Sequence, residues 1–394
     1  MYPYKSRVLE RLGLRSWINA SNWSTTLGGT WLHQEVLDAM NEVAKTFVPM
    51  DELLEKAGRR IAELCRVDAA HVTCGAAAGI ELAVAACMTG KDTRLQLQLP
   101  HTEGMRNEVV MPRGHANHYT PNWYASGARI VEYGWSGYLR LRGHEIDDAI
   151  TERTCCLGYV HSYHCTPRGE IPIDEVVRVA RRHELPVVVD TASMLPPVSN
   201  LHRFADAGVD LSIFSGGKGI RGPNDTGLIL GKGERGKELI EAIRMFSCPN
   251  GGWGRALKVS KEQIVGLVTA LEIFVREGDA WYDQQMATCR SLVDALSGIP
   301  NVSVHIIPND PDYHEHPVYP HVPRVVVEWD AGTLGLTPDD VDAAMAAEDP
   351  PIVLRRGIYS NIYRAKAWRL IDTYYLREGE AQIVAERLRR ALTR

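Results

Sequence analysis

A lysine flanked by glycines is the residue of this 394-residue chain whose surroundings most clearly suggest chemistry. Lys218 lies in the run Ser215-Gly-Gly-Lys-Gly-Ile-Arg-Gly-Pro, directly after an apolar run typical of a buried strand. Ligands of open α/β sheets bind at the carboxyl ends of strands, and glycines let the backbone approach a ligand closely. A partly desolvated lysine has a depressed pKa, which frees its amine to attack an aldehyde. This segment alone is equally compatible with a surface turn that carries a solvated lysine.

An aspartate follows a second apolar run, at Val187-Val-Val-Asp190. A buried carboxylate is costly unless it is paired. A pyridinium nitrogen would supply the pairing, because the carboxylate keeps the nitrogen protonated and makes the ring an electron sink. A helix N-cap or a metal ligand is the alternative role for Asp190.

Two further segments have residues suited to a cofactor. The run Thr73-Cys-Gly-Ala-Ala-Ala-Gly79 lies between a predicted strand and a predicted helix, and amides at a helix N-terminus favour phosphate. His115 follows a predicted strand that ends at Met111, where its imidazole could stack on a ring; a structural histidine is the alternative. The six histidines between His101 and His164 lack the spacing of a zinc-binding helix, so we expect no metal.

The elements that must position these residues alternate between strand and helix along the chain. Strands are expected at 71–74, 107–111, 129–132, 154–160, 186–190, 209–214 and 226–230. This alternation predicts a mostly parallel sheet covered on both faces. The segment between Phe214 and Thr226 is too short for a crossover helix, so we expect that pair to be antiparallel. The expected domains are an N-terminal arm (1–45), a large domain (46–260) and a smaller α+β domain (261–394).

The order of these segments resembles that of fold type I pyridoxal-phosphate (PLP) enzymes. More narrowly, it is similar to the branch that holds bacterial selenocysteine synthase and the D-glucosaminate-6-phosphate ammonia-lyase-like proteins. The resemblance covers roughly residues 15–280 and is carried by Ile18–Ser21, Leu27–Gly29, Cys74–Gly79, Arg113–His115, Val189–Asp190, Ser215–Lys218, Gly222–Pro223, Gly254–Arg255 and Lys258–Glu262. It implies a mostly parallel, seven-stranded sheet flanked by helices, with a smaller C-terminal domain.

The resemblance also assigns roles. Lys218 would hold PLP as a Schiff base, Asp190 would bind the pyridine nitrogen and His115 would stack on the ring. The phosphate and the rest of the cofactor would contact Gly75, Ala76, Ala77, Ser193 and Ser215. The resemblance further implies a homodimer or larger homo-oligomer, in which the N-terminal arm closes over an active site at the interface.

Four residues are candidates for substrate binding. Trp23 stands where the similar lyase-like proteins have smaller residues, and Trp253 stands in the loop before Arg255. We expect both indoles near the substrate pocket, where their bulk argues against a sugar-phosphate substrate. Arg355 and Arg356 end a predicted strand, and a guanidinium matches a carboxylate in bidentate fashion. Because neighbouring strand residues point to opposite faces, only one arginine can line a pocket. We expect Arg356, because Gly357 would allow close approach; a solvated surface pair is the alternative.

The expected function is a PLP-dependent enzyme that acts on an amino acid or a similar small molecule through a carbanionic (quinonoid) intermediate. Family resemblance favours a lyase that catalyses α,β-elimination, with an aminotransferase or amino-acid racemase as the alternative. A catalytically inactive scaffold and a metal-dependent hydrolase are alternatives from other classes. The net charge of −5 argues against a nucleic-acid partner. The chain has no apolar run of about 18 residues and no apolar stretch near its start, so we expect no membrane partner and a cytoplasmic location.

Overall fold

The computed structural model describes residues 2–134, 141–162, 171–307, 322–356 and 367–393. The chain forms two compact units: a large unit, Leu32–Gly278, and a small unit composed of Met1–Trp31 and Asp279–Arg394. This division differs from the expected boundaries at 45/46 and 260/261. The second difference arises because helix α11 (Lys261–Glu277) packs against α2 (Gln34–Ala44) and α3 (Met50–Cys65) of the large unit.

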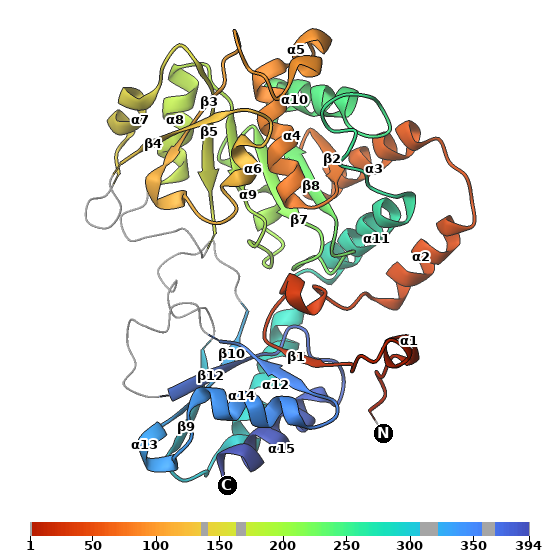
Figure 1. The fold of residues 1–394 in the computed structure, drawn as a ribbon, viewed down its shortest axis with the longest axis vertical. Helices are drawn as coiled ribbons and strands as arrows, with labels where there is room; N and C mark the ends of the chain where they lie inside the picture. The colour runs from red at the N-terminus through yellow and green to blue at the C-terminus, as the bar shows by residue number, and fades with distance from the viewer. Residues whose placement is uncertain (1, 135–140, 163–170, 308–321, 357–366, 394) are drawn as a thin grey trace. The chain divides into compact units, whose positions relative to one another are not determined.

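The large unit is built on a seven-stranded, mostly parallel sheet, as expected (Figure 1). Its strands, in spatial order, are β2 (Ala69–Thr73), β8 (Gly227–Gly231), β7 (Leu211–Ser215), β6 (Val187–Asp190), β5 (Thr154–Val160), β3 (Glu108–Pro112) and β4 (Arg129–Tyr133). The strands from β7 to β4 are parallel, whereas β8 is antiparallel to both of its neighbours. The antiparallel pairing expected for the short connection after Phe214 is therefore confirmed.

Helices cover this sheet and bury its strands. Helix α4 (Ala76–Thr89) packs on β8, β7, β6 and β5, and Val188 of β6 belongs to the apolar cluster beneath it. Val187 and Val189 alternate with Val188 and are equally buried, so both faces of β6 are covered. The other helices of this unit are α5 (Thr93–Gln98), α6 (Pro121–Tyr124), α7 (Gly143–Ala149), α8 (Ile173–Arg182), α9 (Asn200–Asp206) and α10 (Gly233–Phe246), with a short 3-10 turn at Arg113–His115.

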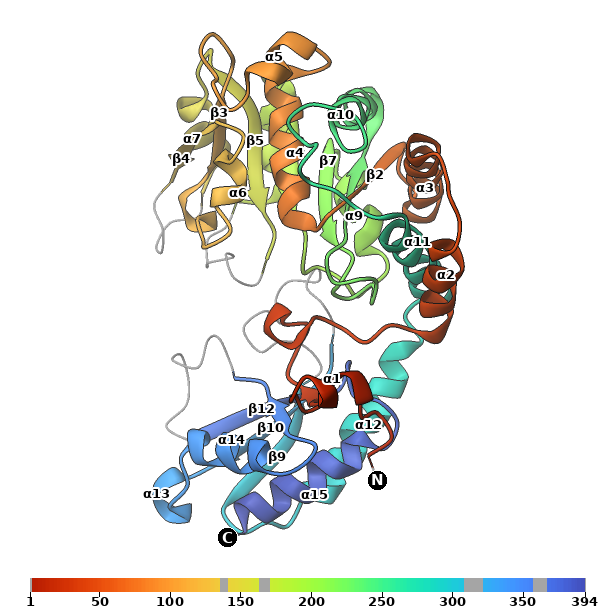
Figure 2. The same cartoon turned by 45° about the vertical axis from the view of Figure 1, so that its right-hand side comes forward.

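The small unit combines an antiparallel sheet with helices and residues from the start of the chain. Its three-stranded sheet has the order β12 (Ala367–Asp372), β10 (Arg324–Trp329) and β9 (Val302–Ile307). Helix α12 (Trp281–Leu296) packs on β9 and β10, and α15 (Glu380–Leu392) lies beside it (Figure 2). The remaining helices are α1 (Arg7–Arg11), a 3-10 turn at Thr25–Leu27, α13 (Ala331–Leu334) and α14 (Pro338–Ala347).

A two-stranded parallel sheet ties the N-terminal segment into the small unit. Strand β1 (Ile18–Ala20) pairs with β11 (Ile352–Leu354), and both Ile18 and Ala20 are fully buried. The segment expected as an arm therefore contributes a strand and core residues to this unit.

Among the described residues, no helix combines the length and apolarity needed to cross a membrane.

Candidate active site

Close packing fixes the backbone around Lys218. A Cβ atom on Gly216 would lie 2.2 Å from Thr226 Oγ1, and one on Gly219 would lie 2.4 Å from the Leu195 carbonyl oxygen. A Cβ on Gly217 would lie 2.4 Å from the Cα of Asn224. Side chains at these three positions would push the loop away from its neighbours. The glycines therefore hold Lys218 at one position just beyond the carboxyl end of β7.

Asp190 and Lys218 interact electrostatically at this edge of the sheet. Asp190 is the last residue of β6, is buried, and accepts a hydrogen bond of 2.9 Å from the Ala192 N–H. Burial raises the pKa of Asp190, and the charge of Lys218 partly offsets this effect. Burial likewise lowers the pKa of Lys218, and Asp190 partly offsets it. The amine is therefore more easily deprotonated than that of a solvated lysine, as a nucleophile or a base requires.

A glycine turn leads into helix α4. Gly75 is the N-cap residue, has φ +101°, and supplies no side-chain cap to the first amides of the helix. Thr73 Oγ1 instead donates a hydrogen bond of 2.8 Å to the Gly75 carbonyl, which fixes the turn. The first N–H groups of the helix, which include those of Ala76 and Ala77, therefore form a donor set for an anion such as phosphate.

Strand β8 brings Ser215 towards this turn. Gly227 pairs with Thr73 on one side and with Ser215 on the other. A Cβ on Gly227 would lie 2.5 Å from the Gly75 carbonyl carbon, so only a glycine allows the turn to pack there. Gly227 is therefore next to Ser215 in the sheet and also packs against the Gly75 turn that begins α4. It brings together two segments that are far apart in the sequence.

His115 is held by β5. Its side chain is 1% exposed, and its Nδ1 accepts a hydrogen bond of 3.1 Å from the Val160 N–H. Its ring contacts Tyr159 edge to face, with centroids 4.5 Å apart. An accepting Nδ1 means that the neutral ring carries its proton on Nε2. The structure therefore places His115 beside the strand whose end residue, Val160, pairs with Asp190.

Two polar residues at the end of β5 belong to the same region and were missed in the sequence. The backbone N–H of His161 donates 2.9 Å to the Asp190 carbonyl, and its ring stacks with Tyr159 at 6.2 Å. Ser162 Oγ lies 3.4 Å from Ser193 Oγ, which places the expected cofactor residue Ser193 beside this strand end. Because ligands of such sheets bind at the carboxyl ends of strands, the end of β5 would have indicated His161. In the sequence it was considered only as one of six histidines between His101 and His164.

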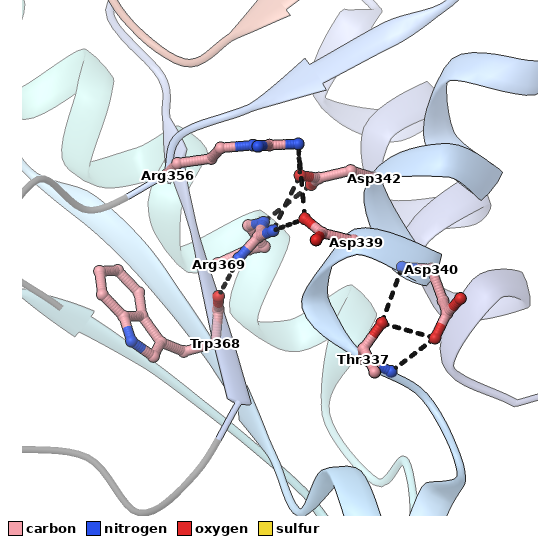
Figure 3. A network of polar contacts seen from close by, with 7 residues as sticks. All are labelled: Thr337, Asp339, Asp340, Asp342, Arg356, Trp368 and Arg369. Carbon is pink, nitrogen blue, oxygen red and sulfur yellow. Dashed lines mark hydrogen bonds and ion pairs between the residues drawn. The ribbon is translucent and has the colours of Figure 1, made fainter. Parts of the chain in front are cut away.

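The two arginines after β11 lie in different surroundings. Arg356 is exposed, and its Nη2 lies 2.8 Å from Asp342 Oδ2 and 3.6 Å from Asp339 Oδ1 on α14. Arg369 contacts the same two carboxylates, and the backbone carbonyl of Trp368 accepts a hydrogen bond from Arg369 (Figure 3). Thr337 and Asp340 cap the start of α14 beside this network. Arg356 is thus part of an ion-pair network on the surface of the small unit.

Arg355 is buried instead. Its Nη1 lies 3.3 Å from Asp372 Oδ2, and Arg324 Nε lies 3.1 Å from the same oxygen. Its backbone pairs with Leu370 of β12 through hydrogen bonds of 2.9 and 3.1 Å. The two arginines, which follow β11 (Ile352–Leu354), therefore lie in different surroundings, Arg355 buried beside Asp372 and Arg356 exposed beside α14. Gly357, on which the preference for Arg356 was based, lies outside the described residues.

The two expected indoles pack against protein groups. Trp23 is buried in the small unit, with its ring edge to face with Tyr375 at 5.9 Å. Trp253 packs on the apolar cluster beneath α4 in the large unit. Their role in substrate binding stays a prediction.

Among the described residues, no group of three or more His, Cys, Asp or Glu side chains could hold a metal ion.

Comparison with known proteins gives consistent matches. The family model described as SelA, L-seryl-tRNA selenium transferase, matches residues 20–303. A D-glucosaminate-6-phosphate ammonia lyase of Salmonella typhimurium is 32% identical over 97% of both chains. A 5'-C-glycyluridine monooxygenase-decarboxylase of a Streptomyces species is 33% identical over 88% of this chain and 83% of its own.

Solved structures match as well. The structure of a D-glucosaminate-6-phosphate ammonia-lyase superposes with a TM-score of 0.82 at 31% identity and covers 100% of this chain and 99% of its own. A serine palmitoyltransferase from S. paucimobilis, solved with a bound PLP-myriocin adduct, has a TM-score of 0.55 at 13% identity, over 96% of this chain and 87% of its own. The second likeness shows the fold alone, which is that of fold type I PLP enzymes.

Proposed function

Because the chain belongs to the SelA family, we propose that it is a PLP-dependent lyase that acts on an amino acid or a similar small molecule. The observation that carries this proposal is the electrostatic pair of Lys218 and Asp190 at the carboxyl edge of the sheet. Asp190 is buried and Lys218 is partly buried, so each charge is costly unless a partner compensates it, and PLP would offer a partner to both.

The residues of the large unit fit each part of PLP. The Lys218 amine suits the aldehyde, and the Asp190 carboxylate suits the protonated pyridine nitrogen. The amides that follow Gly75, together with Ser215, suit the phosphate. His115 and Ser193 lie beside the same strand ends, at β5 and β6. When bound, PLP supplies an electron sink for charge that develops at the substrate α-carbon.

Lys218 is the base that this arrangement provides. Burial lowers the pKa of its amine, so the unprotonated fraction is larger than in a solvated lysine, and this amine would take a proton from the substrate α-carbon and later return it. Asp190 would hold the proton on the ring nitrogen, and this cationic partner would offset the burial that raises the pKa of the carboxyl group. In an α,β-elimination a group on the neighbouring carbon, such as a hydroxyl, would leave once this α-proton is removed, and ammonia would follow when water hydrolyses the released enamine.

We place the substrate carboxylate on Arg355 rather than on Arg356. Arg356 is exposed and paired with carboxylates of α14, so water and salt weaken any further ion pair there. Arg355 is buried, and an ion pair is stronger where water is excluded. Asp372 holds the guanidinium in place, which lowers the entropy lost when a carboxylate binds.

A product screen tests the reaction type. Purified protein reconstituted with PLP would be mixed with amino acids and amino sugar acids, including the D-glucosaminate 6-phosphate named in the relatives, with and without a 2-keto-acid acceptor. We expect ammonia and a deaminated product, detected by mass spectrometry, without an acceptor. Turnover only with the acceptor would indicate an aminotransferase, and inversion without loss of ammonia would indicate a racemase.

A Lys218→Ala variant serves as the control for the same screen. It should fold, as judged by circular dichroism, but should form no borohydride-stable link to PLP. A link of unchanged stoichiometry in this variant would place the cofactor on another lysine and would refute the proposed site.

A further inference from the structure

Arg355, which we assign to the substrate carboxylate, is joined to β12 by an isolated backbone bridge. Its N–H donates 2.9 Å to the Leu370 carbonyl, and the Leu370 N–H donates 3.1 Å to the Arg355 carbonyl. The bridge lies just beyond the end of β11, and β11 itself pairs with β1. The position of the Arg355 backbone on β12 therefore depends on what holds the neighbours of these two residues.

One carboxylate of α14 contacts a neighbour on each side of this bridge. Asp342 accepts hydrogen bonds of 2.8 Å from Nε and from Nη2 of Arg369, the residue before Leu370 (Figure 3). Its Oδ2 also lies 2.8 Å from Nη2 of Arg356, the residue after Arg355. Asp342 thus contacts both of the segments that the bridge joins.

The two ion pairs of Asp342 differ in strength. The side chains of Arg369 and Asp342 are only 10% and 18% exposed, and the guanidinium meets both carboxylate oxygens in bidentate fashion. Water and salt therefore weaken this pair little. Arg356 is 69% exposed, and exposed pairs contribute little. Asp342 therefore acts on the bridge mainly through Arg369.

Strand β12 carries both anchors of Arg355. Leu370 holds its backbone, and Asp372, two residues further along the same strand, holds its guanidinium at 3.3 Å. Helix α14 packs against both β11 and β12, and the pair of Asp342 with Arg369 fixes the helix to β12 beside these anchors. A loss of this pair would loosen the strand at the place where it orients the guanidinium.

We propose that Asp342 is a positioning residue for substrate binding: through Arg369 it holds β12 where β12 anchors Arg355, and so keeps the Arg355 guanidinium ready for the substrate carboxylate. This inference rests on the proposed function, because it takes Arg355 as the carboxylate-binding group. Asp342 would raise the affinity for the substrate without touching it, since a guanidinium that is already ordered loses less entropy on binding.

Ligand binding to the PLP-loaded protein tests this role. The probes are the substrate identified by the product screen and its carboxamide, which lacks the negative charge, and binding is measured from the change in visible absorbance of the bound cofactor. Asp342→Asn should weaken binding of the substrate about 3- to 10-fold, as expected when one long side chain must be ordered on binding. Binding of the carboxamide should change less than about twofold. General damage to the fold would weaken both.

A double-mutant cycle shows whether Asp342 acts through Arg355. In an Arg355→Gln background, Asp342→Asn should have no further effect on the dissociation constant of the substrate, because the group that it positions is already absent. Arg369→Gln should reproduce the effect of Asp342→Asn, and Asp342→Glu, which keeps the carboxylate, should bind more tightly than Asp342→Asn. The matched control is Asp339→Asn. Asp339 lies 3.6 Å from both arginines but is exposed, so binding should change less than about twofold.

The outcomes separate this inference from the proposed function. Equal weakening of the substrate and the carboxamide in Asp342→Asn, or additive effects in the cycle, would overturn the positioning role and leave the PLP site intact. A wild type that binds both probes equally would overturn the inference together with the assignment of Arg355. If PLP produces no visible absorbance in the wild type, the proposed function fails, and the inference fails with it.

Discussion

Replacement of each of the two adjacent arginines by glutamine should change substrate binding to very different extents. Arg355→Gln removes a buried guanidinium from Asp372, whereas Arg356→Gln removes an exposed one from Asp342 and Asp339. A charge-assisted hydrogen bond to a carboxylate is worth about 1.5–3 kcal/mol, which corresponds to about a 10- to 150-fold change in binding. We therefore expect Arg355→Gln to raise KM by this factor. Arg356→Gln should change KM less than about twofold, because the substrate carboxylate is assigned to Arg355. It should also cost at most about 1 kcal/mol of stability, because exposed ion pairs contribute no more than this.

Stability measurements separate binding from damage to the fold. Asp372 keeps Arg324 as a partner at 3.1 Å in Arg355→Gln, so this variant should lose less stability than Asp372→Asn. Asp372→Asn removes the carboxylate shared by two buried guanidiniums and should cost about 3–5 kcal/mol. The assays are steady-state kinetics on the substrate found in the product screen and denaturant unfolding of each variant. A raised KM in Arg356→Gln with an unchanged KM in Arg355→Gln would refute the assignment.

Four other predictions follow from the site and the fold. Lys218→Ala should lower turnover at least about 100-fold, measured as product formed with saturating PLP. Asp190→Asn should still bind PLP but lower kcat about 10- to 150-fold through the lost charge-assisted bond; near-wild-type rates would contradict the role given to Asp190. Burial lowers the pKa of His71 to about 4 from 6.5, so the unfolded chain binds a proton more readily than the folded protein does. The free energy of unfolding should therefore decrease as the pH falls below 6.5, by about 2 kcal/mol near pH 5. In His71→Leu the free energy of unfolding, measured with denaturant, should depend less on pH over this range. Solution scattering should show a homodimer or larger assembly, and a fully active monomer would exclude the expected role of residues 19–29 at an interface.

The sequence allowed the large unit to be predicted because its signals are local. Apolar runs marked β5, β6 and β7, and the short connection after Phe214 indicated the antiparallel β8. Strand ends then identified Asp190 and Lys218, whose charges influence each other's pKa in the structure. Gly227 was not singled out, because its importance depends on a turn at Gly75 that is remote in the sequence.

The small unit was harder to predict because its contacts join distant segments. The pairing of β1 with β11 has no local signature, so the N-terminal residues were taken for a separate arm. The predicted strand continued through Arg355 and Arg356, whereas β11 ends at Leu354, and which arginine is buried depends on Asp372 and Asp342, which lie on other elements. Periodicity alone gives two faces of a strand and does not tell which one meets the core.

The joining of β1 to β11 also has a consequence for biosynthesis. Ribosomes release a chain from its N-terminal side, so residues 1–31 emerge before residues 32–278, and β11 is made after both. The large unit, Leu32–Gly278, is continuous and can fold as soon as it has emerged. Throughout that time Ile18 and Ala20, both fully buried in the finished protein, have no strand to pair with. A nascent chain stalled after residue 278 should therefore keep its N-terminal segment open to proteases, and only completion of the C-terminal segment should protect it.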